Sequence, residues 1–182
     1  MEQRIGNKTL DMVYTALFAV VMVICSFICI PTAIPFTLQT FAVFLAVAVL
    51  GGKRGSMAVF LYLLMGAIGL PVFVGFTGGI GRLFDATGGY LLGFLLAALV
   101  MWGAEHLFGK KDLVLCISMV LGLLLCYTFG TAWYLFLYGK TTEMSLAAVL
   151  SVCVIPFMIP DIIKIAMVLV LRKRLIKVLR LQ

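Results

Sequence analysis

Long apolar runs, separated by short polar or glycine-rich segments, dominate this chain. The runs fall at residues 10–30, 36–50, 56–70, 90–106, 113–138 and 145–171. Each run is continuously apolar and lacks the alternation of apolar and polar residues that marks barrel strands. Continuous apolarity of this length favours helices in lipid. The sequence therefore predicts one domain over residues 1–182, an all-α membrane protein built as a six-helix transmembrane bundle.

Two of the predicted spans are short, and one is interrupted. Residues 36–50 would extend about 22 Å at 1.5 Å per residue, whereas the hydrocarbon core of a bilayer is about 30 Å thick. We expect this helix, and the similarly short 56–70, to be irregular or sheltered by neighbours. Pro31–Pro35 and Gly51–Gly55 are predicted turns. The last run is expected to break at its two prolines and to restart with Pro160 in the first turn.

Composition supports lipid as the solvent. Of the 182 residues, 64% are hydrophobic and 12% are charged, whereas a soluble domain carries roughly 25% charged residues. A net charge of +7 could indicate nucleic-acid binding in a soluble protein. Here the basic residues form short clusters between apolar runs, which is the pattern of membrane topology. No nucleic-acid partner is expected.

The distribution of lysine and arginine predicts the orientation. With the N-terminus inside, 11 basic residues fall on the inner side, namely Arg4, Lys8, Lys53, Arg54, Lys110, Lys111, Arg172, Lys173, Arg174, Lys177 and Arg180. Only Arg82 and Lys140 fall outside. This asymmetry predicts that the N and C termini are both cytoplasmic and that the glycine-rich segment 71–89 lies on the outer side.

Asp161 and Lys164 are two ionisable residues inside the last apolar run. An unpaired charge there costs roughly 2.5–3.5 kcal/mol on insertion scales. Their spacing places both side chains on one helix face, where they can pair. We expect Asp161 near the N-terminus of the restarted half-helix, and broken helices at membrane depth often mark solute sites. The alternative is a self-neutralising pair that only orders the bundle.

A second candidate site lies in the outer glycine-rich segment. Its only charges are Arg82 and Asp85, and glycines such as Gly79 let backbone amides approach a ligand closely. Arg82 has the reach and permanent charge suited to a carboxylate. An ordinary exposed loop with a surface arginine is the alternative.

Aromatic and amide side chains gather on the same predicted outer side. The candidates for the wall of an apolar pocket are Phe36, Phe73, Phe76, Tyr90 and Trp133. An interfacial aromatic belt is the alternative, and it is favoured for Tyr134 and Tyr138. Gln39 and Thr40 are expected either to face the same pocket or to bond to a neighbouring helix.

Motifs for enzymatic chemistry are not found in the sequence. Gly139-Lys140-Thr141 ends like a phosphate-binding loop, but Tyr134 stands where that pattern needs glycine. His106 is the only histidine, and a metal site needs more ligands. No ATPase, metal or cofactor is therefore expected. A solute-binding transport protein is favoured over a membrane-embedded enzyme or a structural helical module.

Four stretches resemble a known family. They are Ile34-Pro-Phe-Thr-Leu-Gln-Thr40, Leu63-Leu-Met-Gly-Ala-Ile-Gly-Leu-Pro-Val-Phe73, Thr87-Gly-Gly-Tyr-Leu-Leu-Gly-Phe94, and Pro156-Phe-x-x-Pro-Asp-x-x-Lys164. Together they look like the BioY family, the biotin-specific S components of energy-coupling factor (ECF) transporters. The resemblance runs from about residue 10 to 172. Asp85-Ala86 stands where family members often have Gly-Pro.

The resemblance implies a six-helix S-component fold in the plasma membrane of a bacterium. Biotin would bind on the extracellular side, under the loop between the third and fourth helices. Energy would come from an ECF transmembrane coupling subunit and two ATPase subunits. A small-residue face of the first helix, often Ala-x-x-x-Ala, would meet that partner. The matching residues here are Thr15, Ala16, Ala19 and Val20.

Different residues are expected to bind the two polar ends of biotin. Asp161 and Lys164 would supply an acceptor and a donor to the ureido group, and Arg82 or Lys164 would meet the carboxylate. The residues alone do not select biotin, because other ring-bearing vitamins would satisfy the same chemistry. They also leave open whether the chain works alone, as a homo-oligomer, or only with ATPase partners.

Overall fold

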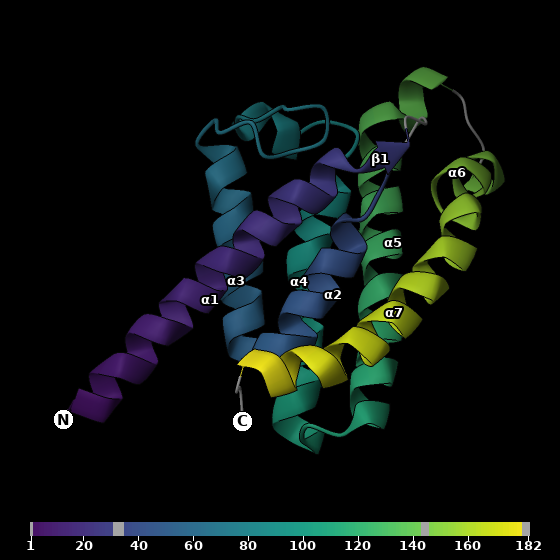
Figure 1. Cartoon of the computed structure of the whole chain (residues 1–182). Coiled ribbons are helices and arrows are strands. Elements are labelled where there is room, and N and C mark those ends of the chain that lie inside the picture. The colour runs from purple at the N-terminus through teal and green to yellow at the C-terminus, as the bar shows by residue number, and fades with distance from the viewer. Residues whose placement is uncertain (1, 31–34, 143–145, 180–182) are drawn as a thin grey trace.

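A computed structural model describes residues 2–30, 35–142 and 146–179 of the chain. Its helices are α1 (Glu2–Phe27), α2 (Gln39–Leu50), α3 (Gly52–Ala67), α4 (Gly88–Phe108), α5 (Asp112–Thr142), α6 (Leu146–Cys153) and α7 (Ile155–Leu179). A 3-10 helix, η1 (Ile80–Leu83), lies in the glycine-rich segment, and two short strands, β1 (Cys29–Ile30) and β2 (Phe36–Thr37), form an antiparallel pair. The start of α1 and the end of α7 lie at the same end of the bundle (Figure 1).

The prediction of an all-α membrane protein is confirmed. Four helical segments are long and apolar enough to cross a membrane: Lys8–Phe27, Gly88–Phe108, Asp112–Gly139 and Val149–Leu179. As predicted, α2 and α3 are shorter. Each of the six apolar runs contains a helix, and the last run divides into α6 and α7.

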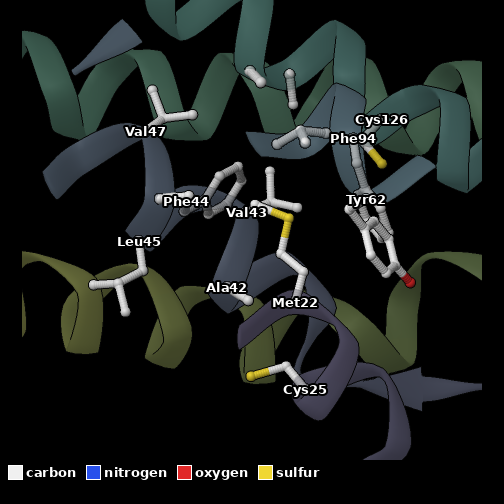
Figure 2. Packing of buried hydrophobic residues seen from close by; sticks show 14 of the residues in the cluster. Met22, Cys25, Ala42, Val43, Phe44, Leu45, Val47, Tyr62, Phe94 and Cys126 are labelled. Atoms are coloured by element: carbon white, nitrogen blue, oxygen red, sulfur yellow. The ribbon is translucent and has the colours of Figure 1, made fainter. Parts of the chain in front are cut away.

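The short helix α2 forms the centre of the bundle. Every residue from Ala42 to Leu50 is buried, and α2 packs against α1, α3, α4 and α7. Figure 2 shows Met22 reaching from α1 toward Val43 of α2, with Tyr62, Phe94 and Cys126 grouped nearby. A helix of 12 residues spans only about 18 Å. Its neighbours, rather than lipid, therefore surround most of its surface, as the sequence led us to expect.

The second run does not begin as a helix. Phe36 and Thr37 pair as β2 with Ile30 and Cys29 of β1, and the helix starts only at Gln39. The Leu38 N–H also donates to the Ile28 carbonyl at 3.3 Å, which extends this backbone pairing. Backbone groups that a helix would have satisfied internally are thus satisfied across the two strands. The predicted turn at Pro31–Pro35 lies largely outside the described residues, since 31–34 are not among them.

The turn between the second and third helices is tighter than predicted. Only Gly51 lies outside a helix, and α3 already begins at Gly52. Gly51 has φ = 83°, a left-handed conformation that glycine adopts without a steric penalty. The Glu105 carboxylate accepts the Gly52 N–H at 2.5 Å and so caps the start of α3 from α4.

The break in the sixth run falls earlier than predicted. Val154 separates α6 from α7, and Pro156 occupies the first turn of α7, where its missing N–H costs nothing. Pro160 lies inside the helix. Asp161 is therefore almost two turns from the start of α7 and not at a half-helix N-terminus. The basic segment after residue 171 also remains helical, to Leu179.

Glycines allow the closest helix crossings. A Cβ atom at Gly55 of α3 would lie 2.4 Å from Val47 Cα of α2, so the two backbones touch there. A Cβ atom at Gly130 of α5 would lie 2.4 Å from the Tyr90 ring of α4. Small residues at such crossings are typical of membrane bundles, where association depends on van der Waals packing rather than on the hydrophobic effect.

We predict that Gly55→Ala destabilises the bundle by about 1–3 kcal/mol, because the added methyl group meets α2 backbone that cannot move aside. Thermal unfolding of the detergent-solubilised protein measures the effect. Gly103→Ala is the matched control, since a Cβ atom at Gly103 of α4 has no neighbour within 4 Å. Equal melting temperatures for the two variants would contradict the close crossing of α2 and α3.

Candidate functional site

A cavity opens beside α2, where α4, α5, α6, α7 and the segment 68–87 meet it. It encloses about 740 Å³ of empty space, including its open mouth. Its lining residues are Pro35, Thr37, Gln39, Thr40, Phe73, Val74, Arg82, Thr87, Tyr90, Leu91, Phe94, Leu123, Cys126, Tyr127, Cys153, Phe157, Asp161 and Lys164. A largely apolar wall with a few polar groups is typical of small-molecule sites of this size.

The Asp161–Lys164 pair lies in the wall of this cavity. The two side chains are 2% and 3% exposed, and Lys164 Nζ donates to Asp161 Oδ1 at 2.7 Å. The Tyr127 hydroxyl of α5 donates to the other carboxylate oxygen, Oδ2, at 2.5 Å. Because each charge has a bonded partner, the pair can exist within the bundle without the full cost of an isolated charge.

Lys164 also connects α7 to the strand pair. Its ammonium group donates to the Thr37 carbonyl at 2.7 Å and lies 4.3 Å from the centre of the Phe36 ring. An ammonium group has three N–H donors, and two of them are thus assigned. The second run starts as a strand and not as a helix. Its Thr37 carbonyl is therefore free to accept a hydrogen bond from Lys164.

Gln39 belongs to a hydrogen-bond network that fixes the junction between β2 and α2, where Lys164 of α7 bonds to Thr37. Its amide nitrogen donates to the Tyr62 hydroxyl at 2.6 Å, and its amide oxygen accepts the Thr37 hydroxyl at 2.9 Å. The Tyr62 hydroxyl donates in turn to the Val72 carbonyl at 3.3 Å. The network ties β2 to α3 and to the segment after it. Gln39 and Thr40 both line the cavity, and Gln39 also bonds to the neighbouring helix α3.

The loop between α3 and α4 places Arg82 at the cavity. Arg82 Nη1 pairs with Asp85 Oδ2 at 2.5 Å, and the guanidinium is one-third exposed. The Trp133 indole N–H donates to the Asp85 carbonyl at 3.1 Å, which anchors this part of the loop to α5. Among the described residues, no partner bonds to the buried Arg82 Nε. Arg82 thus has an unused donor beside the cavity.

Phe73 anchors the same loop to the bundle core. Its ring is 2% exposed, covers Gly66 of α3 and meets the Tyr62 ring edge-on at 5.5 Å. A short backbone bridge between Phe73 and Thr77 turns the chain back toward Gly79, whose N–H donates to the Gly66 carbonyl at 2.7 Å. This loop therefore has a defined position over the bundle.

The structure brings six of the predicted ligand-site residues into the cavity lining: Gln39, Phe73, Arg82, Tyr90, Asp161 and Lys164. It places four others elsewhere. Phe36 lies behind Lys164, Gly79 bonds to α3, and Trp133 bonds to the loop. Phe76 is 69% exposed and stacks on Phe27 of α1 at 4.1 Å. None of these four is among the residues that line the cavity.

Sequence reasoning missed several lining residues, above all Tyr127. It lies in the middle of a continuous apolar run, where one tyrosine looks like ordinary packing. The available signal was indirect, because a buried tyrosine hydroxyl needs a hydrogen-bond partner and Asp161 needs a donor. Phe94, Phe157 and Cys126 gave no such signal, since apolar residues fill every span.

The predicted partner-contact residues of α1 fall on two faces. Ala19 is 1% exposed and packs in the bundle core, while Ala16 and Val20 are exposed. The Thr15 hydroxyl donates to the Asp11 carbonyl one turn earlier, at 2.8 Å. The outward pair is therefore Ala16 and Val20, one helical turn apart, and the inward pair includes Ala19.

The charged groups around this cavity can recognise a small molecule. Within residues 2–30, 35–142 and 146–179, no cluster of three histidine, cysteine or acidic side chains could hold a metal ion. The cavity offers a carboxylate, an ammonium group and a guanidinium around an apolar space. Such a set suits a small molecule that has a polar ring group at one end and an anion at the other.

Comparison with known proteins agrees with this geometry. The sequence model of the BioY family matches residues 1–181. Biotin transporter BioY2 of Lactococcus lactis subsp. cremoris (strain MG1363) is 38% identical over 176 residues, covering 96% of this chain and 94% of that protein. Biotin transporter BioY of Thermotoga maritima (strain ATCC 43589 / DSM 3109 / JCM 10099 / NBRC 100826 / MSB8) is 38% identical over 170 residues, covering 92% and 96%.

The fold agrees as well. A 2.1 Å crystal structure of the S-component for biotin from an ECF-type ABC transporter matches with a TM-score of 0.83 and 25% identity. The match covers 94% of this chain and 93% of that one. Sequence and fold are thus shared over nearly the whole length, as the four sequence stretches had suggested, and the protein belongs to the BioY family.

Proposed function

We propose that this protein is the substrate-binding membrane subunit of a biotin uptake system. The observation that carries the proposal is the buried Asp161–Lys164 pair in the wall of the cavity. The relatives named as biotin transporters and the S-component for biotin supply the ligand's identity. Stability alone does not explain the pair, because apolar residues of similar volume often stabilise a protein core as well as a buried ion pair or better.

Both members of the pair have unused hydrogen-bonding capacity. An ionised carboxylate offers about four lone-pair sites. Asp161 uses two of them, to accept hydrogen bonds from Lys164 and Tyr127. Lys164 has one N–H beyond its bonds to Asp161 and Thr37. A ureido ring needs an acceptor for its N–H groups and a donor for its carbonyl. Asp161 and Lys164 provide both on one helix face.

The other end of the ligand meets Arg82. A carboxylate tail reaching the loop would meet the permanent charge of the Arg82 guanidinium, whose side chain is one-third exposed. The apolar body between the two ends would lie against Phe73, Tyr90, Phe94 and Phe157.

The proposal includes the setting of this subunit. The protein is a multi-pass protein of a bacterial plasma membrane, with both termini cytoplasmic and the cavity open to the outside, in keeping with its 11 inner and 2 outer basic residues. It is a transport subunit and not an enzyme. ATP is hydrolysed by two partner subunits, which act through a coupling subunit that meets the exposed Ala16 and Val20 of α1.

Removing both charges together tests the pair without leaving one of them unpaired. For Asp161→Asn/Lys164→Met we predict at least about a 100-fold loss of biotin affinity, because hydrogen bonds to charged groups contribute about 1.5–3 kcal/mol each. Isothermal titration of the purified protein measures it. The melting temperature should fall only moderately, because the buried Thr37 carbonyl loses its donor but neither charge is orphaned.

The control removes a different ion pair. Asp11→Asn/Arg54→Gln breaks the 2.9 Å pair between α1 and α3, and neither residue lines the cavity; the change in charge is the same. Its biotin affinity should equal that of the wild type. Wild-type affinity in the Asp161→Asn/Lys164→Met protein would refute the proposed site.

Arg82 is tested with two ligands. Arg82→Gln should weaken biotin binding by about tenfold or more, since a charge-assisted contact to the carboxylate is lost, and should weaken binding of biotin methyl ester much less. Competition binding with both ligands measures the difference. Asp85→Asn is the control, because it removes the loop ion pair but keeps the guanidinium. An equal loss for acid and ester would exclude a carboxylate role.

A further inference from the structure

A second cavity lies at the other end of the bundle. It encloses about 1300 Å³, including its open mouth, where the α2–α3 and α4–α5 turns meet the last part of α7 (Figure 1). None of the residues proposed to bind biotin lines it. Its walls come from α2, α3, α4, α5 and α7, so the packing of the bundle, and no single loop, forms it.

Part of the cavity wall is apolar. It includes the side chains of Val47, Met101, Trp102, Val114, Leu115 and Ile176. Trp102 is 38% exposed, and tryptophan is enriched where membrane meets water. The cavity lies beside the ends of two membrane-length helices, at Phe108 and Asp112. With these helices crossing the bilayer, as proposed above, the cavity lies near the headgroup region.

The rim of the cavity is strongly basic. It carries five cationic side chains, those of Lys53, Arg54, Lys110, Lys111 and Arg172, against one carboxylate, that of Glu105. Glu105 already accepts the Gly52 N–H at 2.5 Å, and its nearest approach to Lys110 is 3.7 Å. The single lining acid is thus already engaged by α3 and by Lys110.

The five cations differ in their partners. Arg54 pairs with Asp11 at 2.9 Å. Arg172 pairs with Asp112 and donates through Nε to the Ala48 carbonyl at 3.0 Å. No ion pair or side-chain hydrogen bond is recorded for Lys53 or Lys111 within the described part of the chain. These two lysines, from α3 and from the α4–α5 turn, are free to bind an anion between them.

We propose that this cavity binds an anionic phospholipid, with the headgroup phosphate between Lys53 and Lys111 and an acyl chain against the apolar walls. Basic pockets between helices at the membrane surface are a known chemistry for such headgroups. A free phosphate ion would satisfy the lysines but would leave the apolar walls exposed to water. An amphipathic ligand matches both parts of the cavity.

The test uses the purified full-length protein in detergent and phosphatidylglycerol labelled on an acyl chain. Fluorescence polarisation measures binding, with unlabelled phosphatidylglycerol, phosphatidylcholine and inorganic phosphate as competitors. Lys53→Gln/Lys111→Gln removes the two free cations. Arg174→Gln/Lys177→Gln is the matched control, since these residues are exposed on α7 outside the cavity and the charge change is the same. Melting temperatures verify that both variants fold.

The expected result is competition by phosphatidylglycerol alone and a loss of about tenfold or more in the Lys53→Gln/Lys111→Gln protein, with little change in the control. Equal losses in both variants would mean diffuse attraction and would overturn the proposal. So would competition by inorganic phosphate, which indicates a free-anion site, or by phosphatidylcholine. Absence of lipid binding, with loss of a co-purified partner subunit in the cavity variant, would make the surface a protein-docking site instead.

Discussion

A lysine ammonium group in the middle of an apolar bundle requires oxygen atoms around it, and this requirement organises one side of the protein. Lys164 obtains them from Asp161, one turn away on α7, and from the Thr37 carbonyl. The first is available because two charges three residues apart share a helix face. The second is available only because the chain before α2 is a strand, whose carbonyl is not consumed by helical bonding.

Much of the remaining architecture follows from that junction. The strand pair shortens the second helix to 12 residues, so α2 is too short to cross a bilayer by itself and is enclosed by four neighbours. Gln39 bonds to Tyr62 and so holds the start of α2 against α3. The Tyr127 hydroxyl of α5 donates a second hydrogen bond to the Asp161 carboxylate. The irregular elements are thus concentrated around the cavity. The closely packed crossings, such as Gly55 on Val47, keep the rest of the bundle fixed.

The sequence predicted the helical class, the short second and third helices and the charged pair, because each leaves a signal along the chain. Apolar runs have a measurable length, and two charges inside a span stand out. It did not predict the strand at Phe36–Thr37, since two residues carry no periodicity. It placed the break at Pro160, whereas the chain uses Pro156, because either proline can occupy a first turn and packing selects between them. Tyr127 and the phenylalanine walls depend on which helix faces meet, which a single apolar run does not encode.

If the buried Asp161–Lys164 pair recognises the polar ring of the ligand, a structure of the protein with biotin bound will show it. We expect the ureido oxygen within hydrogen-bonding distance of Lys164 Nζ, about 2.7–3.2 Å, and a ureido N–H directed at Asp161. The carboxylate should lie beside Arg82. Biotin found in the cavity with its ureido group away from an undisturbed Asp161–Lys164–Thr37 cluster would contradict the account and make that cluster purely structural.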